Sequence, residues 1–238
     1  MNERTALVTG ANKGIGRHIA AQLAAEGFTV YVGSRDAGRG QRAAEEIGGG
    51  ARLLVLDVTD PDSVAEAAAQ VEHLDVLVNN AGISPSLAPP AESGAEEFRR
   101  TYETNVFAVL EVTNAFLPAL RRSAHPRIVN ISSGTASLTW STSPNPQFTP
   151  GHGGGAAYRS SKTALNALTV FYGQTLAEEG FKVNALAPGL RATELNPRAA
   201  ATGGDPAEAA RGAVRLALLP DAGPTGGFFS WDGTPVPW

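Results

Sequence analysis

Short apolar segments alternate with longer segments of helical spacing along this chain. Seven short runs rich in aliphatic and β-branched residues have the length of buried strands, at 5–9, 28–32, 52–56, 74–78, 127–131, 181–186 and 227–230. Between them, apolar residues recur every three or four positions, which predicts helices at 15–26, 38–47, 61–71, 95–122, 157–179 and 206–219. This alternation is typical of β-α-β units. It predicts an α/β fold, a doubly wound parallel sheet covered by helices on both faces.

The segment 134–155 breaks this rhythm. It is rich in Pro, Gly, Ser and Thr, which predicts an irregular loop. A predicted strand precedes it and a predicted helix follows it, so we interpret it as a loop inserted into one domain. A chain of 238 residues is long enough to bury one sizeable core, and we expect a single domain over 1–238.

Composition excludes several classes of function. The 19 Lys and Arg residues against 23 Asp and Glu give a net charge of -4, so we expect no nucleic-acid partner. The absence of cysteine excludes disulfides, thiolate metal sites and cysteine nucleophiles. No apolar run is long enough to cross a membrane, and the first strand begins too early for a signal segment, so we expect a cytoplasmic protein. We expect no metal site, because paired ligand spacing is missing among His18, His73, His125 and His152.

A glycine-rich turn follows the first predicted strand, with the sequence Thr9-Gly10-Ala11-Asn12-Lys13-Gly14-Ile15-Gly16. Residues without a Cβ atom let the chain turn tightly and let a pyrophosphate approach the N-terminus of the next helix. Such a turn alone is also found in ordinary strand-helix connections. Its place in the first β-α unit favours a dinucleotide site at the carboxyl ends of the strands.

Two further segments complete a pattern: Asn79-Asn80-Ala81-Gly82 after the fourth strand, and Tyr158-Arg159-Ser160-Ser161-Lys162 in a predicted helix. Together with the glycine-rich turn, they resemble the successive motifs of short-chain dehydrogenases/reductases, and the similarity covers nearly the whole chain. The resemblance implies a Rossmann fold, a nicotinamide cofactor and oxidoreduction between a carbonyl and an alcohol. The segments 11–16 and 34–36, the long insertion and the C-terminal segment resemble the carbonyl reductase branch of the family.

The end of the second strand bears on the choice of cofactor. Arg35 can bind a 2′-phosphate in bidentate fashion, and Lys13 can add a second positive charge. Asp36 is the competing candidate, because an acid at this distance from the glycines usually binds the ribose of NAD. In the family the position of that acid matches Ser34, so we predict NADP(H). Solvated surface cations are the alternative interpretation of Arg35 and Lys13.

The resemblance implies further cofactor contacts. Asp57 and Val58 match the adenine site, the segment 80–82 leaves room for a ribose, and Pro188 to Thr193 match the segment that orients the nicotinamide carboxamide. Strand-end turns and caps are the alternative explanation for such residues. The full predicted set is Gly10, Asn12, Lys13, Gly14, Ile15, Gly16, Arg35, Asp57, Val58, Asn80, Ala81, Gly82, Tyr158, Lys162, Pro188, Gly189 and Thr193.

Tyr158 and Lys162 stand four residues apart in a predicted helix, which places both side chains on one face. A phenol can supply the proton that an alkoxide needs after hydride transfer, and a nearby ammonium is expected to lower its pKa. Taken alone, such a pair more often belongs to a half-exposed helix face. The family adds a serine that hydrogen-bonds the substrate oxygen, matched by Ser133 rather than Ser132. It also has an asparagine, matched by Asn105, whose main chain holds a water of the proton relay.

The sequence therefore predicts an NADPH-dependent oxidoreductase that reduces a ketone, aldehyde or quinone carbonyl to the alcohol, reversibly, with Tyr158 as proton donor. Two alternatives stay open: a non-catalytic NADP-binding regulator, and a biosynthetic ketoacyl-type reductase that acts on a carrier-bound acyl group. A degenerate catalytic set would favour the regulator, and a basic docking patch would favour the ketoacyl-type reductase. The sequence shows neither feature.

The inserted loop 134–155 is expected to pass over the substrate mouth. Trp140, Phe148 and His152 either line the pocket or pack the loop onto the domain. In relatives the helices beginning near 95 and 157 pair across a two-fold axis, and a loop folded over that face predicts a monomer. A dimer is the alternative, because the helix that starts at Tyr158 keeps apolar residues for such a face.

Overall fold

The strands form one parallel sheet in which the first and fourth strands lie side by side. The computed structural model describes residues 4–148, 153–195, 199 and 203–238. Within these residues the sheet has seven strands in the order β3-β2-β1-β4-β5-β6-β7, each parallel to its neighbours. Their bounds are β1 (Thr5–Val8), β2 (Thr29–Ser34), β3 (Arg52–Val55), β4 (Val76–Asn79), β5 (Arg127–Ile131), β6 (Lys182–Ala187) and β7 (Phe228–Ser230).

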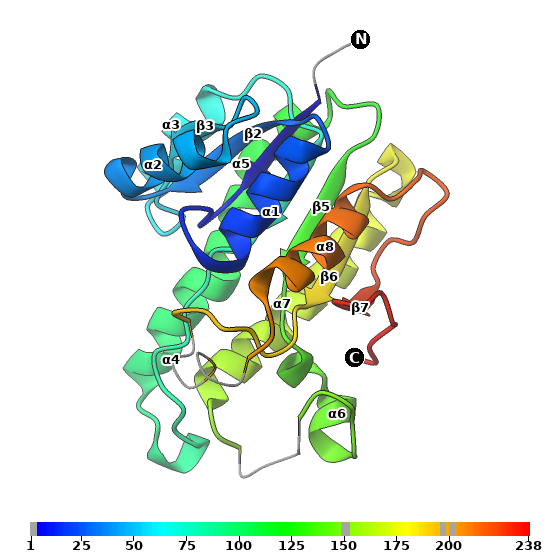
Figure 1. The fold of residues 1–238 in the computed structure, drawn as a ribbon. Coiled ribbons are helices and arrows are strands. Elements are labelled where there is room, and N and C mark those ends of the chain that lie inside the picture. Colours follow the sequence, from blue (N-terminus) through cyan, green and yellow to red (C-terminus); the bar gives the residue numbers. More distant parts are fainter. Residues whose placement is uncertain (1–3, 149–152, 196–198, 200–202) are drawn as a thin grey trace.

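Helices cover both faces of this sheet (Figure 1). Their bounds are α1 (Gly14–Ala25), α2 (Ala37–Ile47), α3 (Pro61–Ala69), α4 (Ala95–Tyr102), α5 (Ala108–Leu120), α6 (Leu138–Thr142), α7 (Ala156–Thr175) and α8 (Pro206–Ala217). Short 3-10 turns occupy Pro90–Glu92, Gly134–Ala136 and Ala177–Glu179. One apolar core joins α1, α2 and α8 to the sheet, and a second core on the other face joins α3 and α5 to it. The predicted doubly wound α/β fold is confirmed.

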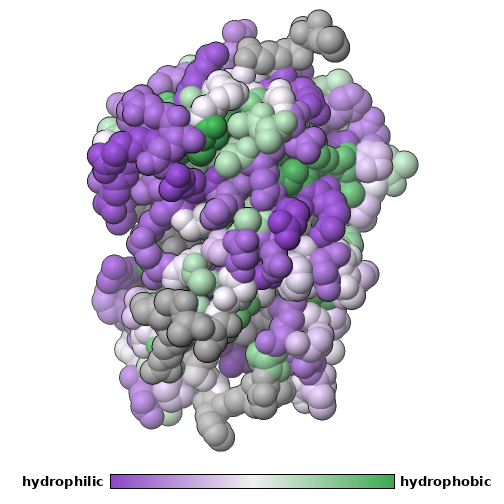
Figure 2. Space-filling model, viewed as in Figure 1, coloured by the Kyte–Doolittle hydropathy of each residue, from purple (hydrophilic) through white to green (hydrophobic). Residues whose placement is uncertain are grey.

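Spacing of the buried residues explains why these helices lie flat on the sheet. The buried residues of α1 recur every three or four positions and form one apolar stripe; they are Gly16, Ile19, Ala20 and Leu23. Strand β4 is buried at every position, as expected for a central strand covered on both faces. The face of the molecule seen in Figure 2 is mostly polar, with small scattered apolar areas. No helix of the described ranges is long and apolar enough to cross a bilayer.

The order of the strands creates the crevice in which a ligand can bind. From β1 the chain passes through β2 to β3 on one side of the sheet, and it then returns through α3 to β4 on the other side of β1. The connections that follow β1 and β4 therefore run in opposite directions, and a crevice opens between them at the carboxyl ends of the strands. The glycine-rich turn follows β1, and the segment 79–82 ends β4 at this same point.

The long helix predicted over 95–122 is interrupted in the structure. A π-helical turn, Glu103–Phe107, separates α4 from α5. Hydrogen bonds from the buried Asn105 side chain to the main chain of Ile83 hold this turn in place. The spacing of apolar residues does not reveal a single π-helical turn within a helix. The prediction of one continuous helix over 95–122 was therefore wrong.

The inserted segment contains regular structure that the sequence analysis did not predict. A 3-10 turn at Gly134–Ala136 leads into α6, whose N-terminus is capped by the Ser137 hydroxyl accepting from Trp140 N at 3.0 Å. Trp140 is buried in a small third core with Phe228 and Val236, and Phe148 packs against it. Trp140 and Phe148 therefore pack the insertion onto the domain, and neither lines the main cavity described below. His152 lies outside the described residues.

The described part of the insertion does not cover the helix face expected to be shielded in a monomer. Its hydrogen bonds to α7 involve Arg159 and Thr163, in the first two turns of that helix. Farther along, Phe171 of α7 is exposed, as are Phe107 and Leu110 at the start of α5. The monomeric state stays a prediction. Its expected cause, an inserted loop that covers the helix face, is not seen in the described residues.

A ladder of buried polar side chains runs beneath the sheet from α5 to α7. The Asn79 amide on β4 donates to Thr113 Oγ1 at 3.0 Å and to Asn130 Oδ1 at 2.9 Å. Asn130 on β5 in turn donates to Thr169 Oγ1 at 2.9 Å. All four residues are buried, so each contact replaces hydrogen bonds to water that folding removes.

Replacing Asn130 with Ala breaks the ladder at its centre. It leaves an Asn79 N–H without its acceptor and the Thr169 oxygen without its donor, and it opens a cavity, so we expect the free energy of unfolding to fall by about 2–4 kcal/mol. Urea unfolding followed by circular dichroism measures this change. The matched control is Asn114→Ala on the exposed side of α5, which removes only the exposed hydrogen bond from Tyr172, so we expect a loss of about 1 kcal/mol or less. Equal losses in both variants would show that the ladder is not specifically stabilising.

Candidate active site

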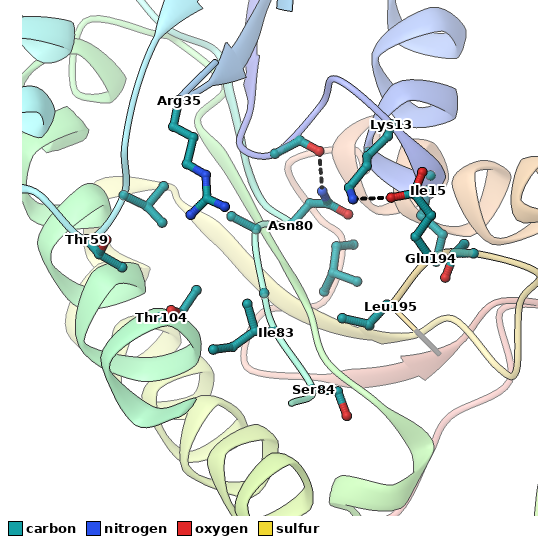
Figure 3. A pocket seen from close by; sticks show the side chains of 18 of the residues that line it. Lys13, Ile15, Arg35, Thr59, Asn80, Ile83, Ser84, Thr104, Glu194 and Leu195 are labelled. Carbon is teal, nitrogen blue, oxygen red and sulfur yellow. Dashed lines mark hydrogen bonds and ion pairs between the residues drawn. The ribbon is translucent and has the colours of Figure 1, made fainter. Parts of the chain in front are cut away.

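A cavity of about 890 Å³ opens at the carboxyl ends of the central strands. Its walls come from the turn after β1, the ends of β2 and β3, the segment after β4, the helices α4 and α7, and the segment after β6 (Figure 3). Every residue of the predicted cofactor set lines it except Gly189. Gly189 instead turns against Trp231, where an added Cβ atom would lie 3.1 Å from the indole Cδ1.

The glycine-rich turn is tied to the end of β4. The Asn80 amide donates to the carbonyls of Thr9 and Gly10, at 2.8 and 3.2 Å. The Thr9 hydroxyl accepts from the main-chain N–H groups of Asn80 and Ala81, both at 3.0 Å. Gly16 faces this contact, and a Cβ atom there would lie 2.4 Å from Asn80 Nδ2. The close approach explains why glycine is needed at the start of α1.

The N-terminus of α1 is suited to bind an anion. Its N-cap residue Lys13 makes no side-chain cap, and no acidic residue lies in the first turn. The first main-chain N–H groups of α1 therefore border the cavity, and no carboxylate from the first turn of α1 competes for them. Together with the glycine-rich turn, this geometry fits the pyrophosphate of a dinucleotide.

Arg35 and Arg39 line the cavity at the end of β2 and in the first turn of α2, and Lys13 lines it from the turn after β1. Asp36 also lines the cavity, and both of its carboxylate oxygens are engaged in capping α2, accepting from Arg39 N at 2.9 Å and Arg39 Nε at 2.8 Å. These contacts lower the pKa of Asp36. Lys13 forms an ion pair with Glu194, from the segment after β6.

Asp57 lies in a turn and still borders the cavity. Its Oδ1 accepts from Thr59 N at 3.0 Å and from Thr59 Oγ1 at 2.8 Å, so the turn-cap explanation accounts for one of its two oxygens. Val58 and Thr59 line the cavity beside it. The position is compatible with the predicted adenine contact.

Lys162 is buried beside the cavity. The residue is only 4% exposed, and its Nζ donates to the Ile131 carbonyl at 2.8 Å. Burial lowers the pKa of Lys162 to about 8. Its Nζ lies 5.9 Å from the centre of the Tyr158 ring, and a Cβ atom on Gly82 would lie 3.4 Å from it. Gly82 thus leaves room for the ammonium.

Tyr158 is paired with Ser133 and not with Ser132. Burial raises the pKa of Tyr158, and a hydrogen bond with Ser133 acts in the opposite direction. Ser133 itself is not among the cavity-lining residues, whereas Ser132 lines the cavity, and the Ser132 hydroxyl donates to Asn166 Oδ1 at 2.6 Å. The sequence led us to expect a lowered pKa for Tyr158, but the pKa is raised, because desolvation outweighs the hydrogen bond with Ser133.

Asn105 lies behind the cavity wall. Its Oδ1 accepts from Ile83 N at 2.9 Å, and its Nδ2 donates to the Ile83 carbonyl at 2.9 Å and to Ser161 Oγ at 3.0 Å. The side chain therefore holds the segment after β4 against α7. Residue 105 is not among the cavity-lining residues, so its expected part in a water relay stays a prediction.

Sequence reasoning missed several residues of the cavity wall. Arg39 could have been found, because it lies in the first turn of α2, four residues after Arg35 in the chain. Another part of the cavity wall matches no sequence motif and was not predicted. Its residues are Ile83, Ser84, Pro85 and Leu195. Within the described residues no group of three or more acidic or histidine side chains is placed to hold a metal ion.

Comparison with known proteins identifies the family to which this fold and cavity belong. The family profile described as short chain dehydrogenase matches residues 4–203. Salutaridine reductase from Papaver bracteatum is 32% identical, over 95% of this chain and 94% of that protein. (-)-Isopiperitenone reductase from Mentha piperita is 33% identical over 97% of both chains. The structure of NADPH-bound carbonyl reductase from chicken fatty liver matches with a TM-score of 0.86 at 29% identity over 100% of both chains. The chain belongs to the short-chain dehydrogenase family.

Replacing Lys162 with Met tests the cost of burying its ammonium. The pKa of this lysine is about 8 in the folded protein and 10.5 in the reference state. The buried charge therefore destabilises the fold below pH 8, and wild-type stability rises between those two values as the unfolded chain keeps the extra proton. We expect the variant to be more stable by about 1–3 kcal/mol at pH 7, with the difference shrinking toward pH 10.

Urea unfolding of the ligand-free proteins at pH 7 and pH 10 measures this difference. Lys182→Met on β6 is the control, since that side chain is only half-buried. A Lys162 variant less stable than wild type at pH 7 would mean that the hydrogen bond to the Ile131 carbonyl outweighs desolvation.

Proposed function

We propose that this protein is an NADPH-dependent reductase that converts a ketone, aldehyde or quinone carbonyl to the alcohol, reversibly, with Tyr158 as the proton donor. The observation that carries the proposal is the convergence of two sets of residues on one cavity. The glycine-rich turn and the uncapped N-terminus of α1 form one end, and Tyr158 with Lys162 forms the other.

The residues present fit a dinucleotide. The cavity is large enough, glycine stands where a Cβ atom would collide, and cations surround the end of β2. A bound nicotinamide cofactor would supply the hydride. We assign its binding to the predicted set, with Arg39 added and Gly189 in a supporting turn.

In this proposal side chains of the protein bind the carbonyl oxygen of the substrate and supply its proton. The Ser133 and Tyr158 hydroxyls orient the carbonyl oxygen and stabilise the negative charge that develops on it. Since burial raises the pKa of Tyr158, the phenol is protonated near neutral pH and can donate to the oxygen. Lys162 is charged below pH 8 and favours the phenolate that remains. Asn105 keeps the segment after β4 and α7 together.

NADPH is proposed over NADH from the charges around the end of β2. Lys13, Arg35 and Arg39 can meet a 2′-phosphate, whereas Asp36 is engaged in capping α2. The similar chicken carbonyl reductase is described as NADPH-bound, which supports the same choice.

The substrate is proposed only by class. The related proteins named above are described as reductases, and the apolar wall with Ile83, Pro85 and Leu195 suits an uncharged carbonyl compound. A ketoacyl-type reductase remains the second enzymatic candidate, and a panel of ketones, quinones and carrier-bound ketoacyl groups separates the two. The regulator alternative requires that no member of that panel be reduced. The cytoplasmic location stays a prediction.

Replacing Tyr158 with Phe removes the proton donor and keeps the ring. We expect kcat to fall by about 10²–10⁴-fold with little change in NADPH affinity. Steady-state assays of NADPH absorbance, with cofactor affinity from fluorescence titration, measure both quantities. Tyr172→Phe on the same helix is the control, because that hydroxyl donates to Asn114 and lies away from the cavity. Near-normal turnover of the Tyr158 variant would refute the assignment.

Changing Lys13 and Arg35 together to Ala tests cofactor choice. Wild type should prefer NADPH, and the double variant should lose most of that preference, since charge-assisted contacts are worth about 1.5–3 kcal/mol each. The ratio of kcat/KM for NADPH and NADH measures the preference. Arg17→Ala is the control, because Arg17 is a cation of α1 that pairs with Glu46 outside the cavity. A wild-type preference for NADH would contradict the proposal.

A further inference from the structure

The ion pair between Lys13 and Glu194 joins two distant parts of the chain across the mouth of the cavity. Lys13 belongs to the glycine-rich turn, and Glu194 follows β6. Both line the cavity. In Figure 3 the Lys13 side chain points toward Glu194, while Arg35 lies on the other side of Asn80. The residue proposed to bind a 2′-phosphate is therefore already paired with an anion of the protein itself.

This ion pair is exposed and can exchange partners. The Lys13 and Glu194 side chains are 51% and 74% exposed. Water and salt screen a pair of this kind, so the lysine can change partners at low cost. A dianionic phosphate is a stronger partner for an ammonium than a carboxylate, because it carries more charge.

Glu194 also lies in the positive potential of the other cations. Contact with Lys13 is the main reason that its pKa is lowered, and the charge of Arg39 adds to the effect. Two of the other acids of the cavity wall are paired with arginines. Asp36 binds Arg39, and Glu96 lies 3.4 Å from Arg99. Glu194 is the acid whose carboxylate engages Lys13.

We infer that Glu194 is a specificity-determining residue that competes with the 2′-phosphate of the cofactor for Lys13. The inference rests on the proposed NADPH dependence. When NADPH binds, Lys13 exchanges the carboxylate for the phosphate. When NADH binds, no phosphate is present and the ion pair persists. Glu194 thus weakens NADPH binding, leaves NADH binding unchanged, and narrows the discrimination between the two cofactors.

The test compares cofactor binding by wild type and Glu194→Gln without any carbonyl substrate. Glutamine keeps the size of the side chain and removes its charge. Titration of intrinsic protein fluorescence at low and high salt yields dissociation constants for NADPH and NADH. We expect NADPH to bind about two- to fivefold more tightly to the variant at low salt, with NADH unchanged and with the gain reduced at high salt.

Two further variants isolate the interaction. In a Lys13→Met background, Glu194→Gln should no longer change NADPH affinity, because the competition requires the ammonium. Glu46→Gln is the matched control, since Glu46 forms an exposed ion pair with Arg17 outside the cavity. That control should bind both cofactors as wild type does.

Several results would overturn the inference. These are an unchanged NADPH affinity in Glu194→Gln, an equal change for NADPH and NADH, or a gain that persists without Lys13. The proposed function fails separately, if wild type binds NADH more tightly than NADPH or reduces no carbonyl compound. A wild type that prefers NADPH and reduces ketones, combined with an unresponsive Glu194 variant, would refute this inference alone.

Discussion

The hydrogen bonds that tie the end of β1 to the end of β4 hold the whole site together. Thr9 accepts two main-chain N–H groups from the segment after β4, and Asn80 donates back to the carbonyls of Thr9 and Gly10. The two strands are neighbours because the chain, after β3, crosses back and places β4 on the other side of β1. Gly16 lets α1 begin directly against this contact. The N-terminus of α1 and the segment after β4 are therefore held against each other at one end of the cavity.

A second constraint is the burial of the two ionisable groups at the catalytic end. Desolvation raises the pKa of Tyr158 and lowers that of Lys162, so both shifts favour the neutral forms. A raised pKa suits the proton-donor role that we propose for Tyr158. For the lysine, desolvation is a cost to stability, offset in part by the Ile131 carbonyl. The site thus holds a charged amine where the fold alone would prefer an apolar side chain.

The inserted segment contributes to this frame from outside the cavity. Trp140 and Phe148 fix it to the β6 and β7 side of the sheet, and Arg159 joins it to the start of α7 through Ser141 Oγ at 2.9 Å. Arg159 stands next to Tyr158 in the chain. The insertion therefore supports the helix turn that presents the phenol, although its two described aromatic residues do not line the cavity.

Local patterns were enough to predict much of this protein. Alternation of apolar runs located all seven described strands, and glycine spacing located the anion-binding turn, because both depend on residues close in sequence. The π-helical turn at Asn105 and the short helix around Trp140 were missed, since each is held by partners far along the chain. Likewise, no motif indicates that Glu194 forms an ion pair with Lys13, or that burial outweighs the Ser133 hydrogen bond in setting the pKa of Tyr158. Sequence by itself determined which chemical groups are present and in what local order. Tertiary structure decided their pairing and their protonation, because both depend on distance and solvent exposure, which only the packed chain defines.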